Sequence, residues 1–167
     1  MIQDKEFHFS FREIDDITEL PHALQELLVQ SKNAVSNAYA PYSGFKVGAS
    51  VLLENGTIVS GGNQENASYP VGLCAERVTL SAASALHSNN AVVALAVTAC
   101  GINSHIDKPV APCGICRQTI LEYEERFNRN IEIILQGESG KIYWIFSVKD
   151  LLPLYFGNND LTNTNHS

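Results

Sequence analysis

The stretch AVVALAVTAC, residues 91–100, is apolar at both its odd and its even positions. Successive side chains of a strand point to opposite faces of a sheet, so this pattern is typical of an interior strand covered by helices on both sides. Its ten residues are about half of what a membrane-spanning helix requires. The stretch therefore predicts the centre of a layered α/β protein, and we expect no membrane association.

On either side of this strand, the spacing of apolar residues alternates between helical and extended periods. The spacing predicts helices over residues 21–38, 74–87, 114–127 and 148–152, and further strands over 45–53, 57–60, 131–135 and 141–146. Asn55-Gly56 favours a tight hairpin turn between the first two of these strands. The order predicts an α/β fold, a three-layer α/β/α sandwich with a mixed sheet of about five strands.

The chain has 167 residues, which is typical of one domain. We expect an N-terminal arm over residues 1–20, one domain over 21–157 and a flexible, Asn-rich tail over 158–167. In the arm, Phe7, Phe9 and Phe11 alternate with polar residues, which suits a short edge strand or an arm packed on another surface.

The charge of the chain limits its partners. Eleven basic and eighteen acidic residues give a net charge of −7, which repels phosphate backbones, so we expect no nucleic-acid partner. The first twenty residues contain no continuous apolar stretch of the kind that a secretion signal needs. We therefore expect a cytoplasmic protein, whose four cysteines are thiols or metal ligands rather than disulfides.

Three of the cysteines stand at expected helix starts. Cys113-Gly-Ile-Cys116 has the spacing at which two thiolates bind one metal ion from a single turn, although a redox pair or two buried thiols would also fit. Cys74 opens another helix, two residues before Glu76. If both helices begin at the same edge of the sheet, three sulfurs converge on a zinc ion with one open position, as in catalytic zinc sites.

The fourth cysteine, Cys100, leaves an alternative open. All four cysteines together could close the site as a four-cysteine zinc module without catalytic activity. Because Cys100 ends an apolar strand, a simply buried thiol is the other interpretation.

Five segments together carry a resemblance to a known family. The pair of motifs at 74–76 and 112–116 resembles the signature of the zinc nucleoside and nucleobase deaminases. More narrowly, the chain resembles the short homotetrameric cytidine deaminases in the segments YAPYSGFKVGA (39–49), NQENASYP (63–70), CAER (74–77), PCGICRQ (112–118) and LLPLYF (151–156). The match extends in order over about residues 21–157 and departs at the N-terminal arm.

The resemblance implies hydrolytic deamination of cytidine, and also of 2′-deoxycytidine, to uridine and ammonia in pyrimidine salvage. It implies one Zn²⁺ per chain on Cys74, Cys113 and Cys116, with Glu76 as the catalytic proton shuttle for a zinc-activated water. Three thiolates, Zn²⁺ and hydroxide sum to −2, so positive charge is needed nearby. Two helix N-termini and Arg77 can supply it, and the resemblance implies that Arg77 donates hydrogen bonds to the thiolates.

The resemblance also implies a substrate site shared between the subunits of a homotetramer. Asn63 and Glu65 would hold the ribose hydroxyls, Phe45 would pack on the nucleoside, and a neighbouring subunit would place Phe156 over the base. The implied substrate-binding residues are Phe45, Asn63, Glu65, Tyr69, Ala75 and Phe156. For Phe45 and Phe156, plain core packing is the alternative.

A related zinc deaminase of another aminopyrimidine nucleoside, of the blasticidin type, would carry the same zinc signature. The Asn63-x-Glu65 pair and Arg77 favour cytidine over that alternative. Deaminases that act on polynucleotides also share the zinc motif, but the net charge of −7 argues against them.

Overall fold

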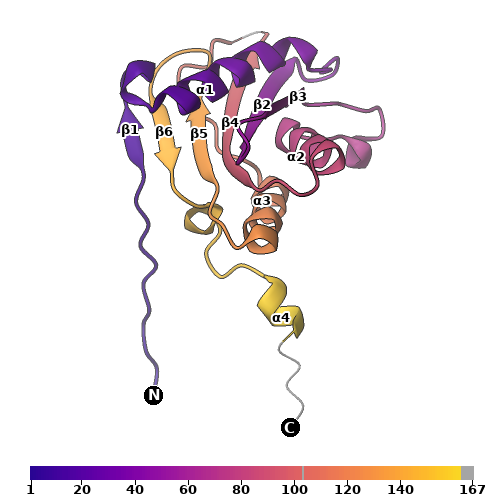
Figure 1. Ribbon diagram of the computed structural model, residues 1–167. Coiled ribbons are helices and arrows are strands. Elements are labelled where there is room, and N and C mark those ends of the chain that lie inside the picture. Colours follow the sequence, from indigo (N-terminus) through magenta and orange to yellow (C-terminus); the bar gives the residue numbers. More distant parts are fainter. Residues whose placement is uncertain (103, 163–167) are drawn as a thin grey trace.

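Six strands form one mixed sheet in the order β1-β6-β5-β4-β2-β3 (Figure 1). The strands are β1 Arg12–Ile14, β2 Phe45–Leu53, β3 Ile58–Gly62, β4 Val92–Gly101, β5 Glu132–Gln136 and β6 Ile142–Ile145. The computed structural model describes residues 1–102 and 104–162. Strands β4 and β5 are parallel, and every other neighbouring pair is antiparallel. The predicted mixed sheet is therefore confirmed.

Helices cover both faces of this sheet (Figure 1). The α-helices are α1 His22–Ala34, α2 Ala75–Leu86, α3 Gly114–Phe127 and α4 Asn158–Thr162, and short 3₁₀ helices occupy η1 Ile17–Glu19, η2 Val35–Asn37, η3 Tyr69–Val71 and η4 Val148–Leu151. Helix α1 lies on one face, while α2 and α3 lie on the other. The last predicted helix is thus a 3₁₀ turn, and the first ends as one.

The interior strand β4 divides the core into two clusters, as its two-sided apolar pattern predicts. Ala94 and Ala96 pack toward α1, together with its buried Leu27. Leu95 and Val97 face the opposite way and pack with residues of α2 and α3. The alternation follows from the period of two residues in a strand. The three-layer α/β/α architecture is confirmed.

The sheet has one strand more than the five expected, because part of the N-terminal arm joins its edge. Strand β1 pairs antiparallel with β6, and Ile14 is buried beneath α1. Arg12 stacks its guanidinium on the ring of Trp144, 4.9 Å from the ring centroid. An edge strand in the arm is one of the two expectations, but it lies at residues 12–14 and not at the alternating phenylalanines of residues 7–11. Three residues with two charges among them show too little apolar alternation to mark that position in the sequence.

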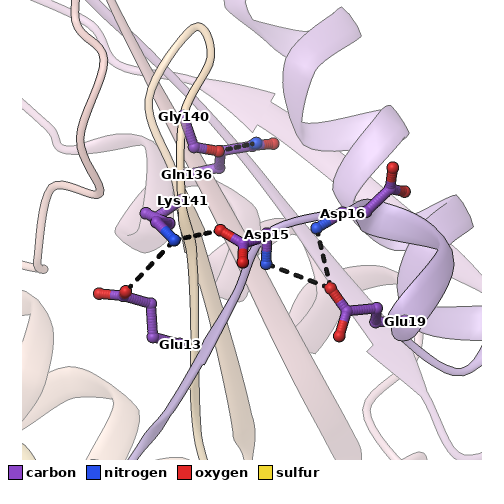
Figure 2. A network of polar contacts seen from close by, with 7 residues as sticks. All are labelled: Glu13, Asp15, Asp16, Glu19, Gln136, Gly140 and Lys141. Atoms are coloured by element: carbon purple, nitrogen blue, oxygen red, sulfur yellow. Dashed lines mark hydrogen bonds and ion pairs between the residues drawn. The ribbon is translucent and has the colours of Figure 1, made fainter.

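Ion pairs and a helix cap secure the end of β1 (Figure 2). Lys141, the residue before β6, pairs with Glu13 at 3.6 Å and with Asp15. The carboxylate of Glu19 accepts hydrogen bonds from the backbone N–H groups of Asp15 and Asp16 at 3.3 and 3.1 Å. These contacts fix the turn that leads into α1.

The backbone of α1 packs directly against the backbone of β2 at Gly48. A Cβ atom at Gly48 would overlap the backbone of Ser31 and Val35. Only glycine permits this approach.

No helix in the described ranges, 1–102 and 104–162, has the length and apolar character needed to cross a bilayer. The predicted tail begins with α4, and residues 163–167 lie outside the described residues. The arm and domain boundaries stay predictions.

Candidate metal centre and substrate cavity

Helices α2 and α3 bring three cysteines together. Cys74 and Cys113 are the N-cap residues of α2 and α3, and Cys116 lies in the first turn of α3. The two helices are neighbours, since the Tyr123 hydroxyl of α3 donates a 2.9 Å hydrogen bond to the Leu80 carbonyl of α2. Because both N-termini point toward the sulfurs, their partial positive charges favour thiolates there.

The sulfur positions match the dimensions of a zinc site. The Sγ atoms of Cys74 and Cys113 are 3.8 Å apart, those of Cys113 and Cys116 are 3.5 Å apart, and all three atoms lie within 4.8 Å of one another. Tetrahedral zinc with bonds of about 2.3 Å holds its sulfurs about 3.8 Å apart. The donor set therefore fits Zn²⁺, with three protein ligands and one corner not claimed by them.

Two of the three thiols have pKa values that are shifted in opposite directions. A hydrogen bond from the buried Cys116 lowers the pKa of Cys74 to about 6, and the charge of Arg77 contributes to this lowering. The same bond to Cys74, together with burial, raises the pKa of Cys116. Of these two thiols, Cys74 is therefore the more ready to bind a cation. Hydrogen bonds from Arg77 to sulfur stay a prediction.

Glu76 lies in the first turn of α2, beside the sulfurs. Its side chain is only 4% exposed, yet it lines the cavity described below. Burial raises the pKa of the Glu76 carboxyl, because desolvation disfavours the charged form. A carboxyl in this environment is suited to take up and release a proton.

A cavity of about 560 Å³ opens over Cys74, Glu76 and Cys113. This volume lies within the range of small-molecule sites. Four of the residues expected to bind substrate also line the cavity: Phe45, Asn63, Glu65 and Tyr69. They come from the start of β2 and from the segment between β3 and α2, so the fold brings together residues that are distant in sequence.

The side chain of Asn63 is held by the first residues of β2. Its Oδ1 accepts a 2.8 Å hydrogen bond from the Val47 N–H, and its Nδ2 donates a 3.0 Å bond to the Phe45 carbonyl. An amide can accept one more bond at the oxygen and donate one more from the nitrogen. Asn63 is thus fixed in orientation and keeps capacity for a ligand.

Glu65 is anchored in the same way to the turn before β2. Its carboxylate accepts hydrogen bonds from the Tyr42 N–H at 2.8 Å, from the Ser43 N–H at 3.3 Å and from the Ser43 hydroxyl. The Ser43 hydroxyl, followed by the Tyr42 N–H, lowers the pKa of Glu65. A carboxylate that stays ionised is a suitable acceptor for sugar hydroxyls.

Exposed aromatic rings contribute to the lining of the cavity. Phe45 is 39% exposed and Tyr69 is 76% exposed, and both line the cavity. The ring of Tyr42 makes an edge contact with Tyr69 at 6.1 Å between centroids. Such exposure of large rings at a cavity is typical of surfaces that cover a ligand.

Five residues singled out in the sequence fall outside the cavity lining: Ala75, Arg77, Cys100, Cys116 and Phe156. Ala75 is fully buried at the start of α2. Phe156 is 58% exposed, and its carbonyl accepts a hydrogen bond from Gln118 on α3. Cys100 lies at the end of β4, while the metal-ligand cluster found among the described residues contains only the other three cysteines. This placement does not support a closed four-cysteine module.

Sequence reasoning missed the apolar wall of the cavity. Val97 and Ala99 contribute from β4, and Val110 and Ala111 contribute from the segment before α3. In the sequence, the apolar residues at the end of β4 look like ordinary core residues. The apolar pattern does not show at which residue the helices stop covering the strand. Val110 and Ala111 lie in a loop without any local pattern.

The comparisons with known proteins agree with this geometry. The family model described as "Cytidine and deoxycytidylate deaminase zinc-binding region" matches residues 21–128. A cytidine deaminase of Sporosarcina psychrophila is 37% identical over 141 residues, covering 83% of this chain and 95% of the relative.

A second relative, a cytidine deaminase of Halalkalibacterium halodurans, is 37% identical over 139 residues, covering 83% and 98% of the two chains. The crystal structure of cytidine deaminase from Burkholderia pseudomallei superposes with a TM-score of 0.71 at 37% identity, covering 82% of this chain and 100% of that chain. Because the family model matches more than half of the chain and both relatives are 37% identical over 83% of it, this chain belongs to the cytidine and deoxycytidylate deaminase family.

Proposed function

We propose that the protein hydrolytically deaminates cytidine and 2′-deoxycytidine, releasing uridine or 2′-deoxyuridine and ammonia. The observation that carries the proposal is a cluster of three cysteine sulfurs, two of whose residues line one cavity together with a buried glutamate. Cys74, Cys113 and Cys116 would bind one Zn²⁺ per chain. When bound, Zn²⁺ is a Lewis acid that makes hydroxide available near neutral pH.

Glu76 moves the protons of the reaction. Adding water across the C4–N3 bond of cytosine places oxygen on C4 and requires a proton at N3. The Glu76 carboxylate accepts a proton from the water and delivers it to N3. It then transfers the second proton to the exocyclic N4, so that the C4–N4 bond breaks and ammonia leaves. Because Glu76 is buried, these transfers are shielded from competing solvent.

The remaining cavity residues would bind the nucleoside. Asn63 and Glu65 are both orientated by hydrogen bonds to backbone or side-chain groups near the start of β2, which suits recognition of ribose hydroxyls. Phe45 and Tyr69 would pack against the nucleoside. Phe156 lies outside the cavity of its own chain, so contact with a base requires another subunit, as in a homotetramer. Arg77 would complete the charge balance at the thiolates.

The proposal can be tested with a spectrophotometric cytidine assay of the wild type and of Glu76→Gln, in which the zinc content of both proteins is also measured. Glutamine keeps the size of the side chain but cannot shuttle a proton, so turnover should fall at least about 10²-fold while zinc content stays at one per chain. Glu122→Gln, an exposed position on α3, is the matched control and should behave as wild type.

Two results would contradict the proposal. A wild-type protein that holds zinc but leaves cytidine unchanged would refute the substrate assignment. A Glu76→Gln variant with full zinc and full turnover would refute the proton-transfer role. We also propose a cytoplasmic role in pyrimidine salvage, which cell fractionation and growth on cytidine as the sole pyrimidine source would test.

A further inference from the structure

Glu138 lies in the turn between β5 and β6. Its carboxylate accepts hydrogen bonds from the end of β4 and from the loop that follows β4. Its Oε1 accepts hydrogen bonds from the Gly101 N–H at 3.2 Å and from the Ile106 N–H at 3.0 Å. Its Oε2 lies 3.3 Å from Nδ1 of His105. One side chain thus connects the end of β4 with residues 105 and 106.

The backbone of the β5–β6 turn makes further contacts with the same segment. The Glu138 N–H donates a 2.8 Å hydrogen bond to the Ile106 carbonyl, and Ser139 Oγ lies 2.7 Å from Nε2 of His105. A Cβ atom at Gly137 would overlap the carbonyl oxygen of Ile106. The turn and the segment are therefore fitted closely to each other, with the carboxylate as the central acceptor.

Electrostatics favours the ionised form of this acceptor. The N–H groups of Ile106 and Gly101 lower the pKa of Glu138, so the carboxylate is charged throughout the neutral range. Hydrogen bonds to an ionised acceptor are stronger than those between neutral groups.

Both segments that Glu138 joins continue into the walls of the cavity. Ala99 lines the cavity two residues before Gly101, and Gly101 pairs in register with Phe45 of β2. On the other side, the chain runs from Ile106 to Val110 and Ala111, which line the same cavity. A shift of residues 105–106 would therefore move one cavity wall relative to the other.

We propose that Glu138 is a positioning residue that sets the width of the substrate cavity by holding the segment of Val110 and Ala111 against the end of β4. This inference rests on the proposed function for its kinetic consequences. Nothing in the described contacts of Glu138 reaches the three zinc-binding sulfurs.

Independent contacts secure the metal ligand that follows this segment. Arg117 Nε donates a 2.8 Å hydrogen bond to the Pro112 carbonyl, and its Nη1 donates a 2.7 Å bond to the Leu151 carbonyl. Pro112 immediately precedes Cys113, so the start of α3 stays in place without Glu138. Loss of the Glu138 carboxylate should thus weaken substrate binding while zinc content stays unchanged.

The experiment compares Glu138→Ala with Glu138→Gln and with a matched control. A glutamine oxygen can still accept from both N–H groups, so Glu138→Gln should largely restore wild-type behaviour. Glu54→Ala is the control, because Glu54 accepts a comparable 3.1 Å bond from the Ala91 N–H at the opposite ends of β2 and β4.

Glu138→Ala should raise KM for cytidine by about 10- to 100-fold, the range expected when positioning contacts are lost at a distance from the chemistry. The turnover number should change by less than about threefold, and zinc per chain should not change. Amide hydrogen exchange of residues 104–111 should become faster in Glu138→Ala, and Glu54→Ala should show neither effect.

A Glu138→Ala variant whose KM and exchange match those of Glu54→Ala would overturn the proposal. Equal damage from Gln and Ala would overturn it as well, because the acceptor geometry would then be irrelevant. If Glu138→Ala does not fold, Glu138→Asp, which withdraws the carboxylate by one methylene, should show a smaller rise in KM and in exchange. The exchange measurement needs no substrate, so it tests the inference even if cytidine is not the substrate.

Discussion

The buried carboxylate of Glu124 offers the sharpest test of how the fold supports the site. Glu124 is 2% exposed and faces the core from α3. It accepts hydrogen bonds from the N–H groups of Ile131 and Val148 at 2.9 and 3.0 Å, and from the Ser147 hydroxyl at 2.8 Å. One side chain therefore fastens α3, whose first turn carries Cys116, to the entry of β5 and to η4.

Replacement of Glu124 with Ala should destabilise the protein by about 3–7 kcal/mol. Each of the two buried N–H groups left without an acceptor costs about 1–3 kcal/mol, and loss of the Ser147 bond adds about 1 kcal/mol. For a domain of this size, this corresponds to a fall in Tm on the order of 10–20 °C. Glu124→Gln should be much milder, because one amide oxygen can still accept from both N–H groups.

The measurement is urea and thermal denaturation at one fixed protein concentration, with zinc supplied equally to all variants. Glu122→Ala, on the exposed side of the same helix, is the control and should change stability by no more than about 0.5 kcal/mol. A loss below about 1 kcal/mol for Glu124→Ala would refute the reasoning. Equal losses for Ala and Gln would also refute it, since the accepted bonds would then contribute nothing.

Two further predictions concern the fourth cysteine and the packing of α1. Cys100→Ser should keep zinc content and cytidine turnover at wild-type levels, because Cys100 lies outside the three-sulfur cluster; loss of the metal in elemental analysis would restore the four-cysteine interpretation. Gly48→Ala should destabilise by at least about 1–3 kcal/mol in urea titrations, because its Cβ would overlap the α1 backbone. Gly114→Ala has open space and should be neutral or stabilising by up to about 1 kcal/mol, and similar values for both variants would contradict the packing argument.

The strongest parts of the fold could be read from local patterns. The two-sided apolar stretch at 91–100 predicts an interior strand, and β4 occupies Val92–Gly101. The alternation of helix and strand periods predicts a three-layer sandwich, which is confirmed. A short edge strand in the arm is one expectation, but its position at Arg12–Ile14 could not be read, because β1 is held by pairing with β6 and by the stacking of Arg12 on Trp144.

In the cavity, too, some features could be predicted from local sequence patterns and others could not. Cysteine spacing is a local property, so a metal centre on Cys113 and Cys116 is visible in sequence, and Cys74 with Glu76 follows from a second helix start. The apolar wall of Val97, Ala99, Val110 and Ala111 carries no local signal. Neither does Glu138, whose hydrogen-bond donors lie more than thirty residues away in the sequence.

The sequence by itself determined which residue types could bind a metal, move a proton and build an interior strand, because these depend on chemistry and on short-range periodicity. Only the tertiary structure decided that α2 and α3 begin side by side, so that three sulfurs lie within 4.8 Å, and that Cys100 lies apart from them. It also decided which polar groups face each other across loops. The physical reason is that side-chain contacts between distant segments depend on how helices pack on the sheet, and that packing is a property of the whole core.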